Sequence, residues 1–170
     1  MTYKTALITG GAIRIGREIC KRMHENGYNI ICHYNKSEIE AKDLKSELNS
    51  LRENSCEIFC LDLNDLEQVK DLINKISVNF KSLDVLVNNA SSFFKTDITN
   101  QGDSDWDNLI NSNLRGPFLL SKHCKKMLTE SKGSIINISD AMVNRGMKSY
   151  VIYSMAKAGL ENLTKTLARE

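Results

Sequence analysis

The stretch TALITGGAIRIG, residues 5–16, decides the fold. It begins with Thr5–Thr9, a short apolar run with the character of a buried strand, and then enters a glycine-rich turn. A helical pattern follows near Ile15–Asn26 and stops at Gly27, the residue type that most often ends a helix. A strand that passes through a glycine turn into a helix is the opening unit of a parallel α/β sheet.

The same alternation continues along the rest of the chain. Further strands are predicted at Tyr28–Tyr34, Cys56–Leu61, Leu83–Val87 and Ser134–Ile138. Helical periodicity is found at Ser37–Arg52, Asp65–Phe80 and Trp106–Leu128, and a last helix runs from Tyr153 onward. This order predicts an α/β fold with a doubly wound parallel sheet, Rossmann-like, covered by helices on both faces.

The composition excludes several classes of protein. The chain has 170 residues, of which 41% are hydrophobic and 26% charged, with one proline and a net charge of +2, as expected for one folded domain rather than a disordered chain. Both signs of charge are scattered, so no basic face for nucleic acid is predicted. No run approaches the roughly 18 apolar residues of a membrane span, and no signal peptide precedes the first turn. We therefore expect a soluble, cytoplasmic protein.

Neither a disulfide framework nor a metal site is expected. The five cysteines form no Cys-x-x-Cys pair. Cys56 and Cys60 lie four residues apart in a predicted strand, so both should pack in the core on one face. The alternating aspartates of residues 103–107 lack the glycine and glutamate of a calcium loop, and they fit the acidic first turn of a helix instead.

The turn Thr9–Gly16 is suited to hold a phosphate group. Glycines let backbone N–H groups approach a diphosphate at the positive end of a helix. The turn is not a Walker A loop, because Glu18 stands where a magnesium-binding hydroxyl is needed. Nor is it the common G-x-G-x-x-G fingerprint, since five residues separate Gly10 from Gly16. An ordinary strand-to-helix turn is the alternative.

The end of the second predicted strand indicates which nucleotide would bind. Folds that bind NAD place an acidic residue there for the ribose 2′-hydroxyl, whereas a 2′-phosphate needs cations. The segment here is His33-Tyr34-Asn35-Lys36-Ser37, with no acid before Glu38. With Arg14 in the turn, the balance favours NADP(H) over NAD(H), although Lys36 could also be an ordinary surface lysine.

A second group of polar residues lies at the other end of the chain. Tyr153 and Lys157 are four residues apart and share a helix face. We expect the lysine to lower the pKa of the phenol from its usual value of about 10, which would make Tyr153 a usable proton donor. Asp140 ends the fifth predicted strand and Asn88-Asn89-Ala90 ends the fourth. Strand ends of a doubly wound sheet line one crevice, so these residues should meet the glycine turn.

Taken together, these residues resemble the short-chain dehydrogenase/reductase family along the whole chain. The family's glycine turn, its NNA motif, a helix asparagine (Asn113) and YxxxK occur in order. Two positions depart from the family pattern: Arg14 replaces the middle glycine of the turn, and Asp140 replaces the usual serine. Both departures, with residues 33–37 and 89–93, are similar to the pteridine reductases.

The resemblance implies NADPH as cofactor and a role for each matching position. Catalytic residues would be Asp140, Tyr153, Lys157 and Asn113. Cofactor-binding residues would be Gly10, Arg14, Ile15, Gly16, His33, Tyr34, Asn35, Lys36, Ser37, Asp62, Leu63, Asn89, Ala90, Ser91, Tyr153 and Lys157. Substrate-binding residues would be Arg14, Ser91, Phe93, Asp140 and Tyr153.

Some of these roles are specific. Lys36 and Ser37, with His33, would hold the 2′-phosphate, and Asp62 would lie by the adenine. Phe93 would stack on the substrate, with a place in the core as its alternative, because only one of the adjacent pair Phe93 and Phe94 can point inward. Asn113 would sustain a helix kink and a proton-relay water.

A carboxylate at position 140 suits the reduction of a C=N bond. A ketone needs a neutral donor to polarise its oxygen, which serine supplies and a carboxylate does not. An imine nitrogen gains a proton as hydride adds to carbon, and a carboxylate stabilises the resulting cation. We therefore expect an NADPH-dependent reductase of pterins or folates. The alternatives are a ketone or 3-oxoacyl reductase, a non-catalytic NADP-binding module, and, for Asp140 itself, a capping role in a turn.

The sequence printed here stops at Glu170 inside the last amphipathic helix. We expect residues 1–170 to form a single NADP(H)-binding Rossmann-like domain without the C-terminal strands of the family. Either these residues are a fragment of a longer protein, or the fifth strand is an unprotected edge; a chain ending at Glu170 would be weakly active or inactive. The resemblance further implies a homotetramer, in which the two long helices pair between subunits.

Overall fold

The computed structural model describes residues 3–80, 82–99 and 102–170. Five parallel strands form one sheet in the order β3-β2-β1-β4-β5. The strands are β1 (Lys4–Ile8), β2 (Tyr28–Tyr34), β3 (Cys56–Cys60), β4 (Val85–Asn88) and β5 (Ser134–Asn137). The expected α/β fold with a doubly wound parallel sheet is confirmed.

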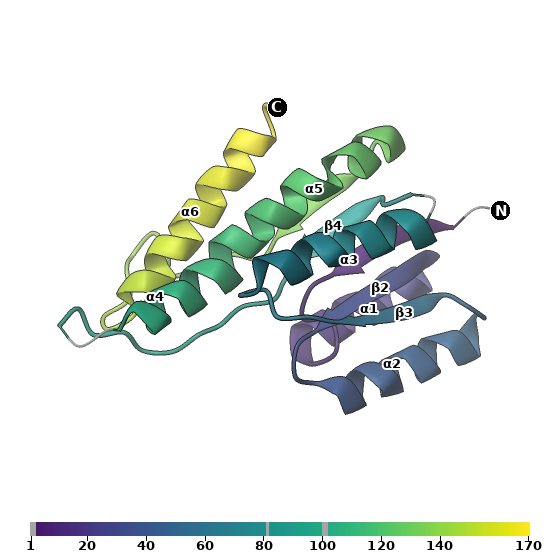
Figure 1. Ribbon diagram of the computed structural model, residues 1–170, viewed down its shortest axis with the longest axis horizontal. Helices are drawn as coiled ribbons and strands as arrows, with labels where there is room; N and C mark the ends of the chain where they lie inside the picture. Colours follow the sequence, from purple (N-terminus) through teal and green to yellow (C-terminus); the bar gives the residue numbers. More distant parts are fainter. Residues whose placement is uncertain (1–2, 81, 100–101) are drawn as a thin grey trace.

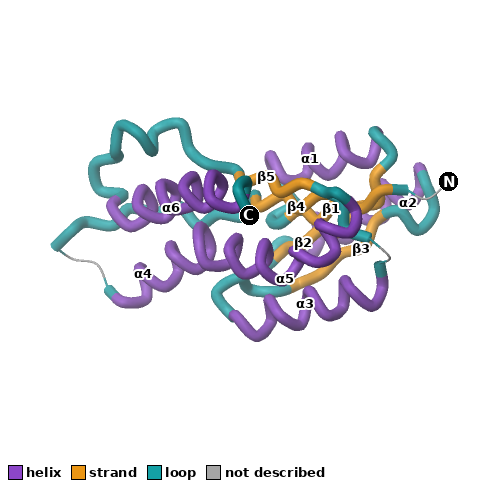
Figure 2. The backbone as a smooth tube through the Cα atoms, turned by 90° about the horizontal axis from the view of Figure 1, so that it is seen from above, coloured by secondary structure: helices purple, strands orange, loops and turns teal. Residues whose placement is uncertain are grey.

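Helices cover both faces of this sheet. The helical elements are α1 (Arg14–Glu25), α2 (Glu38–Leu51), α3 (Leu66–Asn79), α4 (Asp103–Ile110), η1 (Asn111–Arg115), α5 (Gly116–Ser131) and α6 (Val151–Leu167). Helix α1 lies on one side of the strands, and α3 and α5 lie on the other (Figure 2). Helix α6 packs against α4 and also contacts the edge strand β5 (Figure 1).

Two apolar cores result from the alternation of side chains along β1. Ala6 and Ile8 face the core under α1 and α2, whereas Leu7 faces the core under α3 and α5. Strand side chains point alternately to opposite faces, so a strand buried on both faces has to be apolar at nearly every position. This requirement explains why the run in residues 5–9 predicts a central strand.

Local signals set most helix ends. Helix α3 starts after Asp65, whose carboxylate accepts hydrogen bonds from the backbone N–H groups of Glu67 and Gln68 at 3.1 and 3.2 Å. Helix α1 ends just before Gly27, which has a φ of +84°. The acidic residues of α4 lie in its first turn, as expected.

The two cysteines of β3 differ in exposure. Cys56 is buried but Cys60 is exposed, so the prediction that both cysteines pack in the core is wrong for Cys60. Cys60 is the last residue of β3, an edge strand, and its thiol donates to the backbone oxygen of Asn35. Within the described residues the other edge strand is β5.

The described residues contain neither a membrane-spanning helix nor a cluster of metal-binding side chains. No helix there is long and apolar enough to cross a membrane. The same part of the chain holds no cluster of three or more His, Cys, Asp or Glu side chains that could bind a metal.

Candidate active site

The glycine turn between β1 and α1 presents backbone amides to one end of the sheet. Gly10 has a φ of +62°, and a Cβ atom at Gly16 would clash with the carbonyl oxygen of Gly10. Among the described residues no side chain caps the start of α1, and its first turn holds no acid. The N–H groups at this positive helix end are therefore suited to an anionic group such as a diphosphate.

Arg14 adds charge to this turn under conformational strain. Its φ is +50°, a left-handed value that most side chains avoid. Non-glycine residues kept in such conformations are concentrated at functional sites. The departure from glycine at this position therefore coincides with a strained, exposed cation beside the helix end.

A groove of about 680 Å³ runs from this turn along the ends of the strands. Most of the residues expected to bind the cofactor line it: Gly10, Arg14, Ile15, Gly16, His33, Tyr34, Asn35, Lys36, Ser37, Asp62, Asn89, Ala90 and Ser91. Phe93 also lines the groove, together with Asn64 and Asn108, which sequence reasoning missed. Leu63 does not, because its side chain is buried in the core under α3 and α5.

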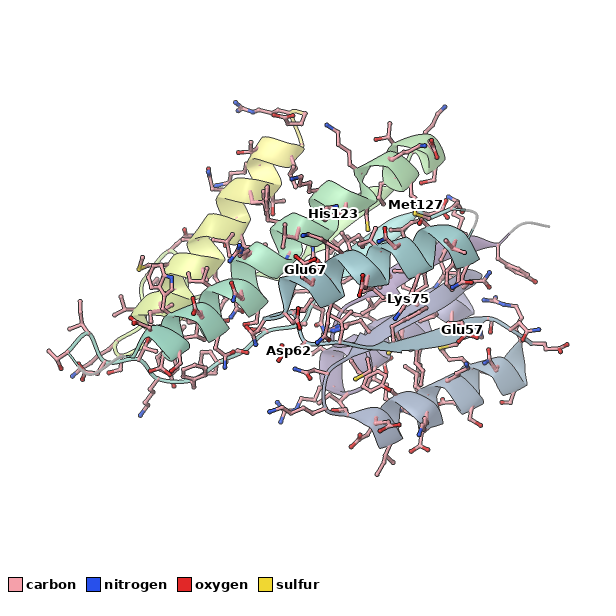
Figure 3. All side chains as sticks on the ribbon, viewed as in Figure 1. Glu57, Asp62, Glu67, Lys75, His123 and Met127 are labelled. Carbon is pink, nitrogen blue, oxygen red and sulfur yellow. The ribbon has the colours of Figure 1, made fainter. Side chains whose placement is uncertain are left out.

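One of the lining residues ties two walls of the groove together, and another orders a turn within one wall. The Asn89 amide donates to the backbone oxygens of Thr9 and Gly10 at 2.9 and 3.2 Å, so it ties the end of β4 to the turn. Asp62 lies beyond the end of β3 (Figure 3), and its carboxylate accepts from the backbone and side-chain amides of Asn64 at 2.9 and 3.0 Å.

His33 lies beneath the groove in a way that the sequence did not suggest. Its side chain is buried, its Nδ1 accepts a hydrogen bond from the Gly10 N–H at 3.1 Å, and its Nε2 lies 3.1 Å from the Leu61 oxygen. Both ring nitrogens are thus occupied within the protein. The expectation that His33 holds a 2′-phosphate is wrong for this conformation, because neither nitrogen is free.

The proton-transfer residues form a second cluster, next to β5. The Tyr153 hydroxyl donates to Oδ2 of Asp140 at 2.9 Å. Oδ1 of the same carboxylate accepts from the Met142 N–H at 2.8 Å, so Asp140 both caps the turn after β5 and contacts Tyr153. The Lys157 ammonium donates to the Ile138 oxygen at 2.8 Å and lies 5.8 Å from the centre of the Tyr153 ring.

The electrostatics of this cluster reverse one expectation. Burial, and next the hydrogen bond and negative charge of Asp140, raise the pKa of Tyr153 well above its usual value. The prediction that Lys157 lowers the pKa of the phenol is therefore wrong here, because the carboxylate and burial dominate. Burial also lowers the pKa of Lys157 to about 8, against a smaller raising effect of Asp140. Tyr153 is thus a neutral hydrogen-bond donor at pH 7.

Asn113 lies in an irregular segment of a long helix. The pattern predicted one helix over Trp106–Leu128, and the structure has α4 and α5 joined by the π-helical turn η1. The Asn113 side-chain N–H donates to the backbone oxygens of Leu109 and Ser92 at 3.0 and 2.9 Å. Its side-chain oxygen accepts from the Ser91 hydroxyl at 2.6 Å. The wide turn thus points this amide at the loop after β4.

The side chains of Phe93 and Phe94 point in different directions, as expected for adjacent residues in an extended loop. Phe94 packs into the small core of Leu109, Ile152 and Tyr153. Phe93 is 55% exposed, and its ring stacks on Tyr150 with the centroids 4.6 Å apart and the planes at 9°. It also meets Tyr153 edge-on at 4.8 Å. Tyr150 was not singled out in the sequence, although its place three residues before Tyr153 could have drawn attention to it.

A comparison with protein families shows to which family a chain with these features belongs. Residues 4–170 match the short chain dehydrogenase family. The chain belongs to that family. As a short-chain dehydrogenase it is an oxidoreductase, and the glycine turn, the groove and the Tyr153 cluster occur in the order that the resemblance implied.

Curated members of the short-chain dehydrogenases differ in their similarity to this chain. A 3-oxoacyl-[acyl-carrier-protein] reductase of Staphylococcus aureus is 35% identical, over 98% of this chain and 68% of the relative. Its counterpart in Staphylococcus epidermidis is 36% identical with the same coverage. Pteridine reductase 1 of Leishmania tarentolae is 30% identical, over 99% of this chain and 72% of the relative. The pteridine reductases are therefore not singled out by overall identity.

Proposed function

We propose that this short-chain dehydrogenase is an NADPH-dependent reductase that reduces a C=N bond in a planar substrate of the pterin or folate type. The observation that carries this proposal is the 2.9 Å hydrogen bond from the Tyr153 hydroxyl to the Asp140 carboxylate. A proton donor thus lies against a fixed negative charge, an arrangement suited to a nitrogen that becomes cationic.

The cofactor would lie along the groove that starts at the glycine turn. The diphosphate would meet the start of α1, where backbone N–H groups and Arg14 supply positive potential. Lys36 and Ser37 line the same groove at the end of β2 and would hold the 2′-phosphate, whereas Asp62 would lie by the adenine. Bound NADPH would supply the hydride.

Asp140 and Tyr153 would manage the proton. Tyr153 keeps its proton on the phenol at pH 7 and would donate it to the nitrogen as the neighbouring carbon is reduced, although burial and Asp140 raise its pKa and so oppose that transfer. The positive charge that develops on the nitrogen is stabilised by the Asp140 carboxylate, an effect that is larger in a partly dehydrated site than in water. Lys157, whose pKa of about 8 permits both protonation states near neutrality, would return a proton to Tyr153.

Phe93 supports a planar substrate. Its ring is held by stacking on Tyr150 and remains 55% exposed, so part of its surface is available to another ring. It lies between the cofactor groove, which it lines, and the Tyr153 hydroxyl cluster, which its edge contacts. A flat heterocycle stacked there would have its nitrogen near the proton donor.

Reduction of a 3-oxoacyl thioester is a second candidate, and the comparisons support it better. The 3-oxoacyl-[acyl-carrier-protein] reductases are 35–36% identical to this chain, against 30% for the pteridine reductase. Against it stands the chemistry of position 140, where a carboxylate repels the oxyanion that forms when a ketone is reduced. Overall identity reflects the shared fold, whereas the substrate is selected by a few side chains at the site.

One experiment separates the two candidates. The loss of NADPH absorbance is measured with dihydrobiopterin, with dihydrofolate and with a 3-oxoacyl thioester, for the natural protein and for Asp140→Asn and Asp140→Ser. We expect turnover of the pterin, a loss of about 100-fold in kcat for Asp140→Asn, and a gain in thioester reduction for Asp140→Ser. Turnover of the thioester alone would establish the second candidate. NADPH binding without turnover of either class would instead indicate a nucleotide-binding module.

We also propose that the protein acts as a homotetramer. Phe118 on α5 and Met155 on α6 are 44% and 50% exposed, which leaves apolar surface on the two helices expected to pair. Light scattering coupled to size-exclusion chromatography tests this, and a monomer at micromolar concentration would refute it.

A further inference from the structure

His33 connects three separate parts of the groove through a single buried side chain. Its ring accepts from the Gly10 N–H at 3.1 Å and reaches the Leu61 oxygen at 3.1 Å. Its backbone oxygen accepts from the Gly11 N–H at 2.9 Å. One residue at the end of β2 thus binds the glycine turn twice and the segment after β3 once.

Because of these contacts, two backbone N–H groups of the turn are not available to a ligand. The N–H groups of Gly10 and Gly11 are both bonded to His33, so they cannot also donate to a phosphate. The remaining donors are those at the start of α1, whose position depends on how the turn is held. The residue that holds the turn therefore controls where these donors point.

The bonds require one form of the imidazole. Nδ1 can accept from Gly10 only if it carries no proton, and Nε2 then carries the proton that is donated to Leu61. An imidazolium or the other tautomer would direct an N–H group at the Gly10 N–H. Burial favours the neutral ring and lowers the pKa of His33 to about 4, with a smaller opposing effect from the Leu61 bond and the charge of Asp62.

We propose that His33, as the neutral tautomer with its proton on Nε2, is a positioning residue for NADP(H): it fixes the glycine turn at the distance from the Asp62 segment that the cofactor must span. The proposal rests on the proposed cofactor. His33 itself would touch neither the phosphates nor the reacting atoms, since its polar atoms are used within the protein.

Two substitutions each keep one of the two hydrogen bonds of the ring and remove the other. In His33→Asn the side-chain oxygen falls near the position of Nδ1, so the acceptor for Gly10 is kept and the donor to Leu61 is lost. In His33→Gln the amide nitrogen reaches the position of Nε2, so the donor to Leu61 is kept and the Gly10 N–H is left without its acceptor. Both variants replace a buried ring with a smaller amide, so a loss of packing affects both.

Binding of NADPH is measured by its fluorescence and by calorimetry, together with the melting temperature. We expect a Kd within about threefold of the natural protein for His33→Asn and at least about tenfold weaker for His33→Gln, with KM for NADPH following Kd and kcat changing by less than about twofold. Equal affinity in the two variants, or loss of affinity only in proportion to melting temperature, would overturn the proposal.

A measurement on the unaltered protein needs no variant to fold. Nitrogen-15 spectra of the histidine-labelled protein should show His33 as the Nε2–H tautomer, and addition of NADPH should shift its signals while the tautomer is kept. A proton on Nδ1 would overturn the proposal. If the natural protein binds no NADPH although the tautomer is as expected, the proposed cofactor is refuted, and the positioning role with it. If the natural protein binds NADPH and the two variants bind it equally, only the positioning role is refuted.

Discussion

Acidification from pH 7 to pH 5 should lower the free energy of unfolding by about 2 kcal/mol through His33 alone. The pKa of this buried ring falls from 6.5 to about 4 in the folded protein, because burial disfavours the charged form. Below pH 6.5 the unfolded chain binds a proton that the folded protein excludes. The stabilisation is therefore complete above pH 6.5 and is lost as the pH falls toward 4, by at most about 1.4 kcal/mol for each pH unit.

Urea unfolding at pH 7 and pH 5, followed by circular dichroism, measures this loss. With a urea m-value of about 2 kcal/mol/M, the midpoint should fall by about 1 M. The control is His33→Asn, which removes the titrating group and should lose about 2 kcal/mol less than the natural protein over the same interval. Burial also lowers the pKa of His24, whose contribution has the same sign but remains in both proteins. An equal loss in the two proteins would refute the reasoning.

Three further predictions test the catalytic cluster, the nucleotide preference and the core. Tyr153→Phe removes only the hydroxyl that donates to Asp140, so kcat should fall by about 100-fold or more while the Kd for NADPH, measured by fluorescence, stays within about threefold. Lys36→Glu should weaken NADPH binding by about tenfold or more and leave NADH binding nearly unchanged in the same titration, because the new charge repels only the 2′-phosphate. Leu86→Ala removes a fully buried side chain of β4 and should cost about 2–5 kcal/mol in urea unfolding. Val78→Ala, at a position that is 83% exposed, should change stability by less than about 0.5 kcal/mol.

Part of the candidate site could be predicted from the sequence, because several of its residues occur in short motifs of consecutive or nearby residues. The glycine turn, the segment after β2, and Tyr153 with Lys157 are each contained in a few consecutive residues, and a parallel sheet brings all strand ends to one edge. The groove accordingly contains most of the residues expected there. Leu63 does not line the groove, because a residue next to a binding position can point into the core, and neither do Tyr153 and Lys157, which lie in the separate cluster next to β5.

The sign of the pKa shift at Tyr153 could not be read from spacing. A lysine four residues away in a helix favours the phenolate, and that much is local. The opposing effects are burial and a carboxylate thirteen residues earlier in the chain, and their size depends on a distance that only folding sets. Tyr150 was missed for a similar reason, since its stack with Phe93 joins segments that are far apart in sequence.

What the sequence by itself determined is the order of strands and helices, the glycine turn between the first strand and the first helix, and the family. These depend on periodicity, glycine positions and short motifs, all of which act over a few residues. Only the tertiary structure decided that the His33 ring bonds to the glycine turn, that a π-helical turn aims Asn113, and that burial and Asp140 raise the pKa of Tyr153. Hydrogen bonding and desolvation depend on which groups meet in space, and these partners come from different strands and helices.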